Sequence, residues 1–92
     1  MVKSEISNAV VDSCLDFIKS QNIAKDPEMI VEITNYIFYF DQLNEDALAY
    51  RCKSLVLLKR HALANNSYLK FIKDYKEIYG EDFGKSFHDM IV

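Results

Sequence analysis

The stretch from Asn44 to Gly80 constrains the fold of this 92-residue chain more than any other part of its sequence. It reads as two helices separated by a short break near Lys59–His61. The residues of the second helix that would face the first are spaced alternately by four and three positions, as a packing seam requires: Ala64, Tyr68, Phe71, Tyr75 and Ile78. We therefore expect an antiparallel helical hairpin, whose two helices approach closely where Ala64 offers little side-chain bulk.

Capping signals indicate where the helices of this hairpin begin and end. The side chain of Asn44 is expected to accept a first-turn N–H, and Glu45 and Asp46 favour the positive end of the helix dipole. The inward-facing residues follow at helical spacing: Leu48, Cys52, Leu55 and Leu58. Gly80 is placed to end the second helix in the left-handed conformation.

Two further helices are predicted upstream of the hairpin. The first runs from about Ser4, a candidate N-cap, to Gln21. Its apolar face recurs at three- and four-residue spacing: Ile6, Val10, Cys14, Phe17 and Ile18. The second helix follows Asp26, which can cap it, and has Pro27 at the first helical position, where a missing N–H costs nothing. The apolar residues of this second helix are Met29, Ile30, Ile33, Ile37 and Phe40.

The segment after Gly80 predicts a short fifth helix that folds back over the hairpin. Its apolar residues again follow helical spacing: Phe83, Phe87, Met90 and Ile91. Half of the chain is hydrophobic, but it contains only two glycines and one proline, which argues against a β-sandwich or barrel. We expect residues 1–92 to form a single all-α domain of antiparallel hairpins, with four main helices plus a short C-terminal helix.

The charge balance and the absence of apolar segments restrict the location and the partners. The formal net charge is −3, and acidic and basic residues are interspersed, which disfavours direct nucleic-acid contact. No apolar run approaches the roughly 20 residues of a membrane span. The N-terminus lacks the apolar region of a signal peptide. We expect a cytoplasmic location without membrane contact, where Cys14 and Cys52 stay reduced.

The residue types that most often carry catalysis or bind metals are sparse. His61 and His88 are the only histidines, and neither stands with a cysteine at metal-ligand spacing. Asp41, Glu45 and Asp46 are better explained by helix capping than by a calcium site, which would need a central glycine. The chain also lacks a phosphate-binding glycine loop. We expect no enzymatic activity, no catalytic residue, no metal or other cofactor, and no small-molecule substrate.

Aromatic and basic side chains supply the candidate binding residues. The second and third predicted helices carry more aromatic residues than they can bury, so Tyr39, Tyr50 and, less strongly, Phe38 are expected at a partner surface. A basic set lies in or just before the fourth helix: Lys59, Arg60, Lys70, Lys73 and Lys76. Because Asp74 and Glu77 interrupt this set, a solvated helix face is its default interpretation. A face for an acidic peptide or a nucleic-acid backbone is the alternative.

From Asp41 to Gly80 the sequence resembles a tetratricopeptide repeat. Six residues fall on the positions that set the distance between the two helices of such a repeat: Leu48, Cys52 and Leu55 in the first, and Ala64, Tyr68 and Phe71 in the second. The junction Asp41–Ala47 resembles the sequence between repeats of the bacterial transcriptional activator domain, a helical module found behind a winged-helix DNA-binding segment. Lys59 stands where glycine commonly makes the turn of such a repeat, and a non-glycine residue in a left-handed turn costs about 1 kcal/mol. Phe71 is large where alanine is typical, which suits a terminal repeat.

This resemblance implies a non-catalytic module for protein–protein contact or self-association. It further implies a C-terminal position in a larger bacterial transcriptional regulator, whose DNA recognition lies elsewhere. Two alternatives remain: a free-standing adaptor that binds a peptide between its helix pairs, and, less favoured, a helical module that binds nucleic acid through the basic set. The first two predicted helices would then form a degenerate preceding repeat. Two repeats are fewer than the roughly three that usually stand alone, so we expect a longer parent chain or dimerisation.

Overall fold

The computed structural model describes residues 2–92, with side chains described from Asn8 onward. Over that range the chain forms five helices and no strand. Their bounds are α1 (Val2–Lys19), α2 (Pro27–Phe40), α3 (Glu45–Leu57), α4 (His61–Tyr79) and α5 (Phe87–Ile91). The all-α fold with four main helices and a short C-terminal helix is therefore confirmed.

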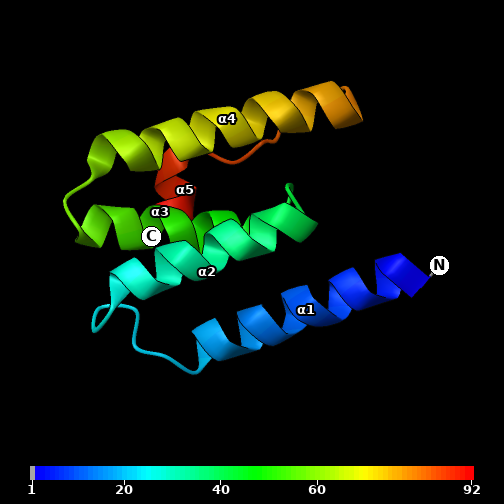
Figure 1. The fold of residues 1–92 in the computed structure, drawn as a ribbon. Coiled ribbons are helices and arrows are strands. Elements are labelled where there is room, and N and C mark those ends of the chain that lie inside the picture. Colours follow the sequence, from blue (N-terminus) through cyan, green and yellow to red (C-terminus); the bar gives the residue numbers. More distant parts are fainter. Residues whose placement is uncertain (1) are drawn as a thin grey trace.

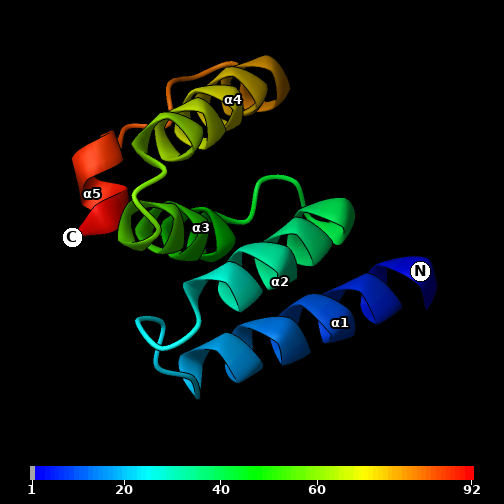
Figure 2. The ribbon, with the colours of Figure 1, turned by 60° about the vertical axis from the view of Figure 1, so that its left-hand side comes forward.

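The four long helices lie side by side in chain order, each antiparallel to the one before it (Figure 1). α3 is the central element, since α2, α4 and α5 all pack on it. α5 lies on one face of α3, on the side away from α2 (Figure 2). The molecule measures 40 × 30 × 17 Å, so its shortest dimension is less than two helix diameters of about 10 Å each.

The caps predicted for the second and third helices are confirmed. The Asp26 carboxylate accepts a hydrogen bond from the Met29 N–H at 3.2 Å, and Pro27 is the first residue of α2. The Asn44 Oδ1 accepts a hydrogen bond from the Ala47 N–H at 2.8 Å. Each cap satisfies a first-turn N–H that has no partner within its helix, which fixes where α2 and α3 begin.

The left-handed residues predicted at the ends of the hairpin helices are also present. Lys59 has a φ of 63°, and its N–H donates to the Val56 carbonyl at 3.0 Å. The N–H of Arg60 donates to the Leu55 carbonyl at 2.8 Å, which completes a Schellman motif after α3. Gly80, with a φ of 73°, ends α4 in the same conformation.

The predicted limits of the first helix are wrong at both ends. α1 begins at Val2, so Ser4 lies within its first turn and is not its N-cap. The helix ends at Lys19, two residues before Gln21. The Ser20 hydroxyl donates to the Phe17 carbonyl at 2.7 Å, and this local bond satisfies a carbonyl that a longer helix would have used.

The predicted apolar face of the first helix is wrong at Phe17, whose side chain is 46% exposed. The buried residues of α1 are Val11, Leu15 and Ile18. Successive residues of a helix are rotated by about 100° around its axis. When Ile18 points into the core, Phe17 therefore points away from the centre of the buried face. The side chain of Ile6, placed on the same face, lies outside the described residues.

The predicted seam of the fourth helix holds as far as Tyr75 but fails at Ile78, which is 55% exposed. Ala64 and Phe71 are buried, and Tyr68 and Tyr75 are half-buried. α4 has 19 residues and α3 has 13, so α4 is longer by about 9 Å at 1.5 Å per residue. The last turn of α4 therefore extends past its packing partner.

The core contains two clusters of packed buried residues. The α1–α2 cluster contains Val11, Leu15, Ile18, Ile30, Ile37 and Ala47. The α3–α4 cluster contains Leu48, Cys52, Phe71 and Met90. Phe38 packs against both clusters and so connects them.

The short helix α5 closes the second cluster. Ser86 and Asp89 form a capping box at its start, with Ser86 N–H to Asp89 Oδ2 at 2.9 Å and Asp89 N–H to Ser86 Oγ at 3.2 Å. Met90 is buried in the cluster, while Phe83 and Phe87 are half-buried against it. A helix of five residues is not stable alone, so this docking holds it in place.

Ala64→Leu should lower the free energy of unfolding by roughly 1–3 kcal/mol, because Ala64 is fully buried where α3 crosses α4. The Cys52 thiol donates to the Ala64 carbonyl at 3.7 Å, so α3 and α4 are in direct contact at this position. Denaturant unfolding of the variant measures the change. The matched control is Ala62→Leu, at an exposed position of the same helix, which should change stability by less than about 0.5 kcal/mol. Equal effects at both positions would contradict the proposed crossing.

Lys59→Gly should raise the free energy of unfolding by up to about 1 kcal/mol. Glycine removes a left-handed strain of roughly 1–2 kcal/mol, and its greater freedom in the unfolded chain cancels part of that gain. Lys59→Ala is the control, because it removes the same charge but keeps the Cβ atom that causes the strain. A stabilisation of similar size in both variants would show that the charge, and not the backbone, is responsible.

Candidate binding groove

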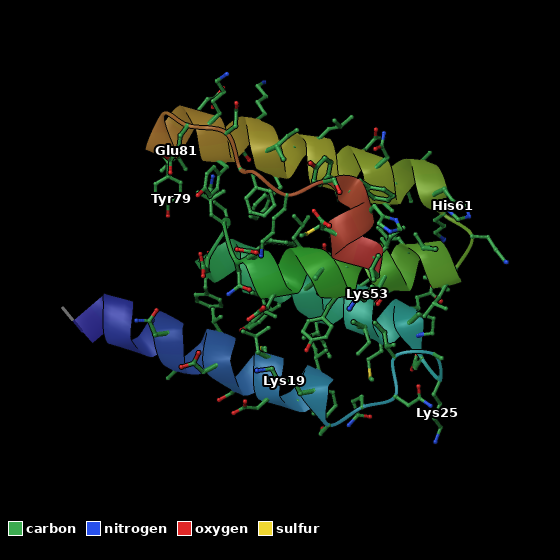
Figure 3. All side chains as sticks on the ribbon, turned by 180° about the vertical axis from the view of Figure 1, so that it is seen from behind. Lys19, Lys25, Lys53, His61, Tyr79 and Glu81 are labelled. Atoms are coloured by element: carbon green, nitrogen blue, oxygen red, sulfur yellow. The ribbon has the colours of Figure 1, made fainter. Side chains whose placement is uncertain are left out.

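A cleft lies between α2 and α4, with α3 as its floor. In Figure 2, α2 and α5 lie on opposite sides of α3. The volume of the cleft is about 240 Å³. Three helices and the α2–α3 connection contribute its lining: Asn35, Phe38, Gln42, Arg51, Ser67, Lys70, Phe71 and Asp74. We call this cleft the groove. In Figure 3 the molecule is seen from behind, with α5 in front of α3 and Lys53 labelled on α3.

Arg51 crosses the floor of the groove and binds both of its walls. Its Nε donates to the Ser67 hydroxyl of α4 at 2.9 Å, and its Nη1 donates to the Asn35 amide oxygen of α2. The Ser67 hydroxyl donates in turn to the Leu63 carbonyl at 2.9 Å, which orients it to accept from Arg51. Burial lowers the pKa of the Arg51 guanidinium from its ordinary value, but the group stays charged.

The remaining walls combine charged and aromatic side chains. Lys70 pairs with Asp74 one turn later on α4, at 3.2 Å. Phe38 of α2 is half-buried and Phe71 of α4 is buried, so their rings close the base of the groove. The groove therefore offers one apolar surface, one internally matched ion pair, and the cationic group of Arg51.

An ion pair ties α2 to the turn between α3 and α4. Arg60 Nη2 lies 3.4 Å from Glu28 Oε1, and both side chains are largely exposed. An exposed pair of this kind contributes little to stability. Neither residue of this pair lines the groove.

The structure does not bring the three predicted aromatic binding residues together. Phe38 lines the groove. Tyr39 is 83% exposed and lies edge-on to the neighbouring Phe40, with ring centroids 5.1 Å apart, away from the groove lining. Tyr50 is half-buried against the α1–α2 cluster. Exposure therefore leaves Tyr39 accessible, whereas Tyr50 contributes mainly to the core.

The five predicted basic residues are likewise distributed over different places. Lys70 lines the groove, whereas Lys73 and Lys76 line a second cleft beside residues 82–85. Lys59 and Arg60 lie at the turn before α4. Acidic partners neutralise three of the five: Glu28 for Arg60, Asp74 for Lys70, and Asp82 for Lys76. They do not form one continuous basic face.

The second cleft holds about 400 Å³ and belongs to the docking of the C-terminal segment. The Tyr68 hydroxyl donates to the Lys85 carbonyl there, and the Lys85 ammonium pairs with Glu45 of α3. Lys76 pairs with Asp82 across the cleft at 3.4 Å. These bonds hold the segment between α4 and α5 against α3 and α4.

By residue type, the cysteines and histidines in the described part of the chain are also candidate site residues. Burial raises the pKa of the Cys52 thiol to about 11, so it is neutral at pH 7 and packs as a small apolar group. His61 is exposed at the start of α4. Among the described residues, no group of three or more histidine, cysteine, aspartate or glutamate side chains could hold a metal ion. Of the helices that the structure describes, none is long and apolar enough to cross a membrane.

The sequence interpretation missed Arg51, Asn35 and Ser67. A signal for Arg51 was present, because it lies four residues after Ala47 and four before Leu55, between residues on the inward side of α3. Burying a charged side chain at such a position costs free energy unless it has a specific hydrogen-bond or ion-pair partner. Asn35 and Ser67 carried no signal of their own, since their role depends on how α2 and α4 pack on α3.

Arg51→Gln should lower the free energy of unfolding by about 1 kcal/mol, because the shorter side chain cannot bond to Ser67 and Asn35 together. Arg60→Gln is the matched control, since it removes the same charge from an exposed pair and should cost about 0.5 kcal/mol or less. Denaturant unfolding compares the two. If Arg60→Gln costs as much as Arg51→Gln, Arg51 does not connect the walls of the groove.

Comparison of the chain with protein-family models, with curated proteins and with solved structures finds no match. Its function is therefore inferred from the residues and the geometry of the groove.

Proposed function

We propose that this chain is a non-catalytic protein-interaction module that binds a peptide segment of a partner protein in the groove. The observation that carries the proposal is the lining of this cleft, which places aromatic rings beside amide, hydroxyl and guanidinium groups. The amides of Asn35 and Gln42 can both donate and accept hydrogen bonds, as a peptide main chain requires. Phe38 offers apolar contact to a side chain of the bound segment.

The size of the groove favours a peptide over a small-molecule ligand. Its volume of about 240 Å³ is below the roughly 300–1,000 Å³ of pockets that enclose a small ligand. A segment of chain needs no enclosure, because it can lie along a cleft between two helices and place only one or two side chains inside it. The dispersal of the basic residues over several surfaces supports nucleic-acid binding less well.

We also propose the setting that the resemblance of residues 41–80 suggests. In this setting the chain is part of a cytoplasmic bacterial transcriptional regulator and supplies a protein contact or self-association, and another segment recognises DNA. The peptide-binding groove is compatible with this setting but does not depend on it, since a free-standing adaptor would use the same surface.

Selection from a random-peptide display library, followed by chemical-shift mapping on the isotope-labelled chain, tests the proposal. We expect selected peptides to perturb the backbone amides of the groove, at residues 35–42, 51 and 67–74. The amides of α1 serve as an internal control, because none of its residues lines the groove. Failure to select any peptide, or perturbations confined to other surfaces, would contradict the proposed function.

A further inference from the structure

Arg51 differs from the other cationic residues near it in the kind of partner it has. Four exposed cations pair with carboxylates: Arg60 with Glu28, Lys70 with Asp74, Lys76 with Asp82, and Lys85 with Glu45. The hydrogen bonds of Arg51 instead go to neutral oxygens, those of Ser67 and Asn35. Among the described residues, no carboxylate lies within ion-pair distance of its guanidinium.

The guanidinium of Arg51 has donors to spare. A guanidinium carries five N–H groups in a planar fork. Nε is used for Ser67 and Nη1 for Asn35, and none of the hydrogen bonds among the described residues uses Nη2. These two bonds hold the plane of the group in one orientation at the floor of the groove. A guanidinium fixed in this way can donate from Nη2 to a carboxylate at little further cost in side-chain freedom.

The charge of the groove sets how much negative charge it can accept. Arg51 and Lys70 are positive and Asp74 is negative, so the lining residues carry one excess positive charge. Lys70 and Asp74 neutralise each other at 3.2 Å. A half-buried cation without a counter-ion has lost hydration that neutral acceptors replace only in part. A single carboxylate would balance this excess, whereas a polyanion would also meet Asp74.

The lining also indicates which kind of carboxylate fits. Terminal carboxylates are commonly held by free backbone N–H groups. Apart from Gln42, all the residues that line the groove lie within helices, where most N–H groups are already bonded. Phe38, half-buried in the lining, offers an apolar surface close to the guanidinium. This arrangement suits a carboxylate on a side chain whose neighbour in the bound segment is apolar.

We propose that the groove selects a peptide segment that carries one aspartate or glutamate next to an apolar residue, with the carboxylate bound by Arg51 and the apolar side chain placed on Phe38. This inference rests on the proposed peptide-binding function and adds the chemistry of its ligand. Arg51 is the specificity-determining residue, and Asn35 and Ser67 are positioning residues that orient its guanidinium.

Peptides selected with the wild-type chain, acetylated at the N-terminus and amidated at the C-terminus, test this inference. We expect an acidic residue beside an apolar one to recur among the selected sequences. Replacing that acid by its amide, Glu→Gln or Asp→Asn, should weaken binding to the wild-type chain at least tenfold, as measured by calorimetry. This comparison leaves the protein unchanged, so it does not depend on whether a variant folds.

Protein variants complete the test. Arg51→Gln should reduce the affinity for the acidic peptide at least tenfold and leave the affinity for its amide counterpart nearly unchanged. Arg60→Gln removes a charge outside the groove lining and should bind both peptides as the wild-type chain does. Circular dichroism establishes that each variant is folded.

The outcomes separate this inference from the proposed function. If the peptides that bind in the groove lack an acidic residue, or if replacing that residue by its amide does not weaken their binding, the acidic specificity is overturned and peptide binding remains. Binding that requires a free C-terminal carboxylate, or a groove occupied through Arg51 by a phosphate-bearing oligonucleotide, also overturns it. The absence of any peptide that binds in the groove overturns both proposals.

Discussion

The structure depends on how closely α3 is enclosed by its neighbours. α2, α4 and α5 all pack on it (Figure 2), which is possible because several of its buried residues are small. Ala47, Cys52 and Ser54 are fully buried, and larger side chains there would push a neighbouring helix away. Ser54 shows what this constraint can cost. Its hydroxyl has no hydrogen-bond partner among the described residues, although an unsatisfied buried hydroxyl costs about 1–3 kcal/mol. The small volume of serine fits the site better than its polarity does.

The groove follows from this arrangement. α2 and α4 pack on different sides of α3, and Phe38 and Phe71 fill the space between them at its base. Asn35 on α2 and Ser67 on α4 also line the groove, one on each wall. Arginine is long enough to reach both walls from α3, and its planar fork lets one residue bond in two directions. The side chain of Arg51 thereby forms the polar floor of the cleft between α2 and α4.

The sequence predicted the local features of this fold better than the contacts between distant residues. Asp26, Asn44 and Gly80 determine helix ends through bonds to residues within one turn, so their roles can be read from nearby sequence. The exposure of Phe17 could not be predicted from nearby sequence, because it depends on how α1 is rotated against α2. The role of Arg51 depends on two helices that lie 16 residues before and after it in the sequence. No local pattern specifies such a three-helix contact, although a charged residue between apolar ones did point to a special position.

The C-terminal segment bears on the groove although it lies on another face of the molecule. Met90 of α5 is buried against the cluster that contains Leu48, Cys52 and Phe71, so α5 covers α3 on the side away from α2. Phe71 belongs to this cluster and also lines the groove. The docking of α5 therefore stabilises one wall of the groove from behind without occupying it. A peptide bound between α2 and α4 would meet a surface whose floor and aromatic base are already held in place, which lowers the ordering cost of binding.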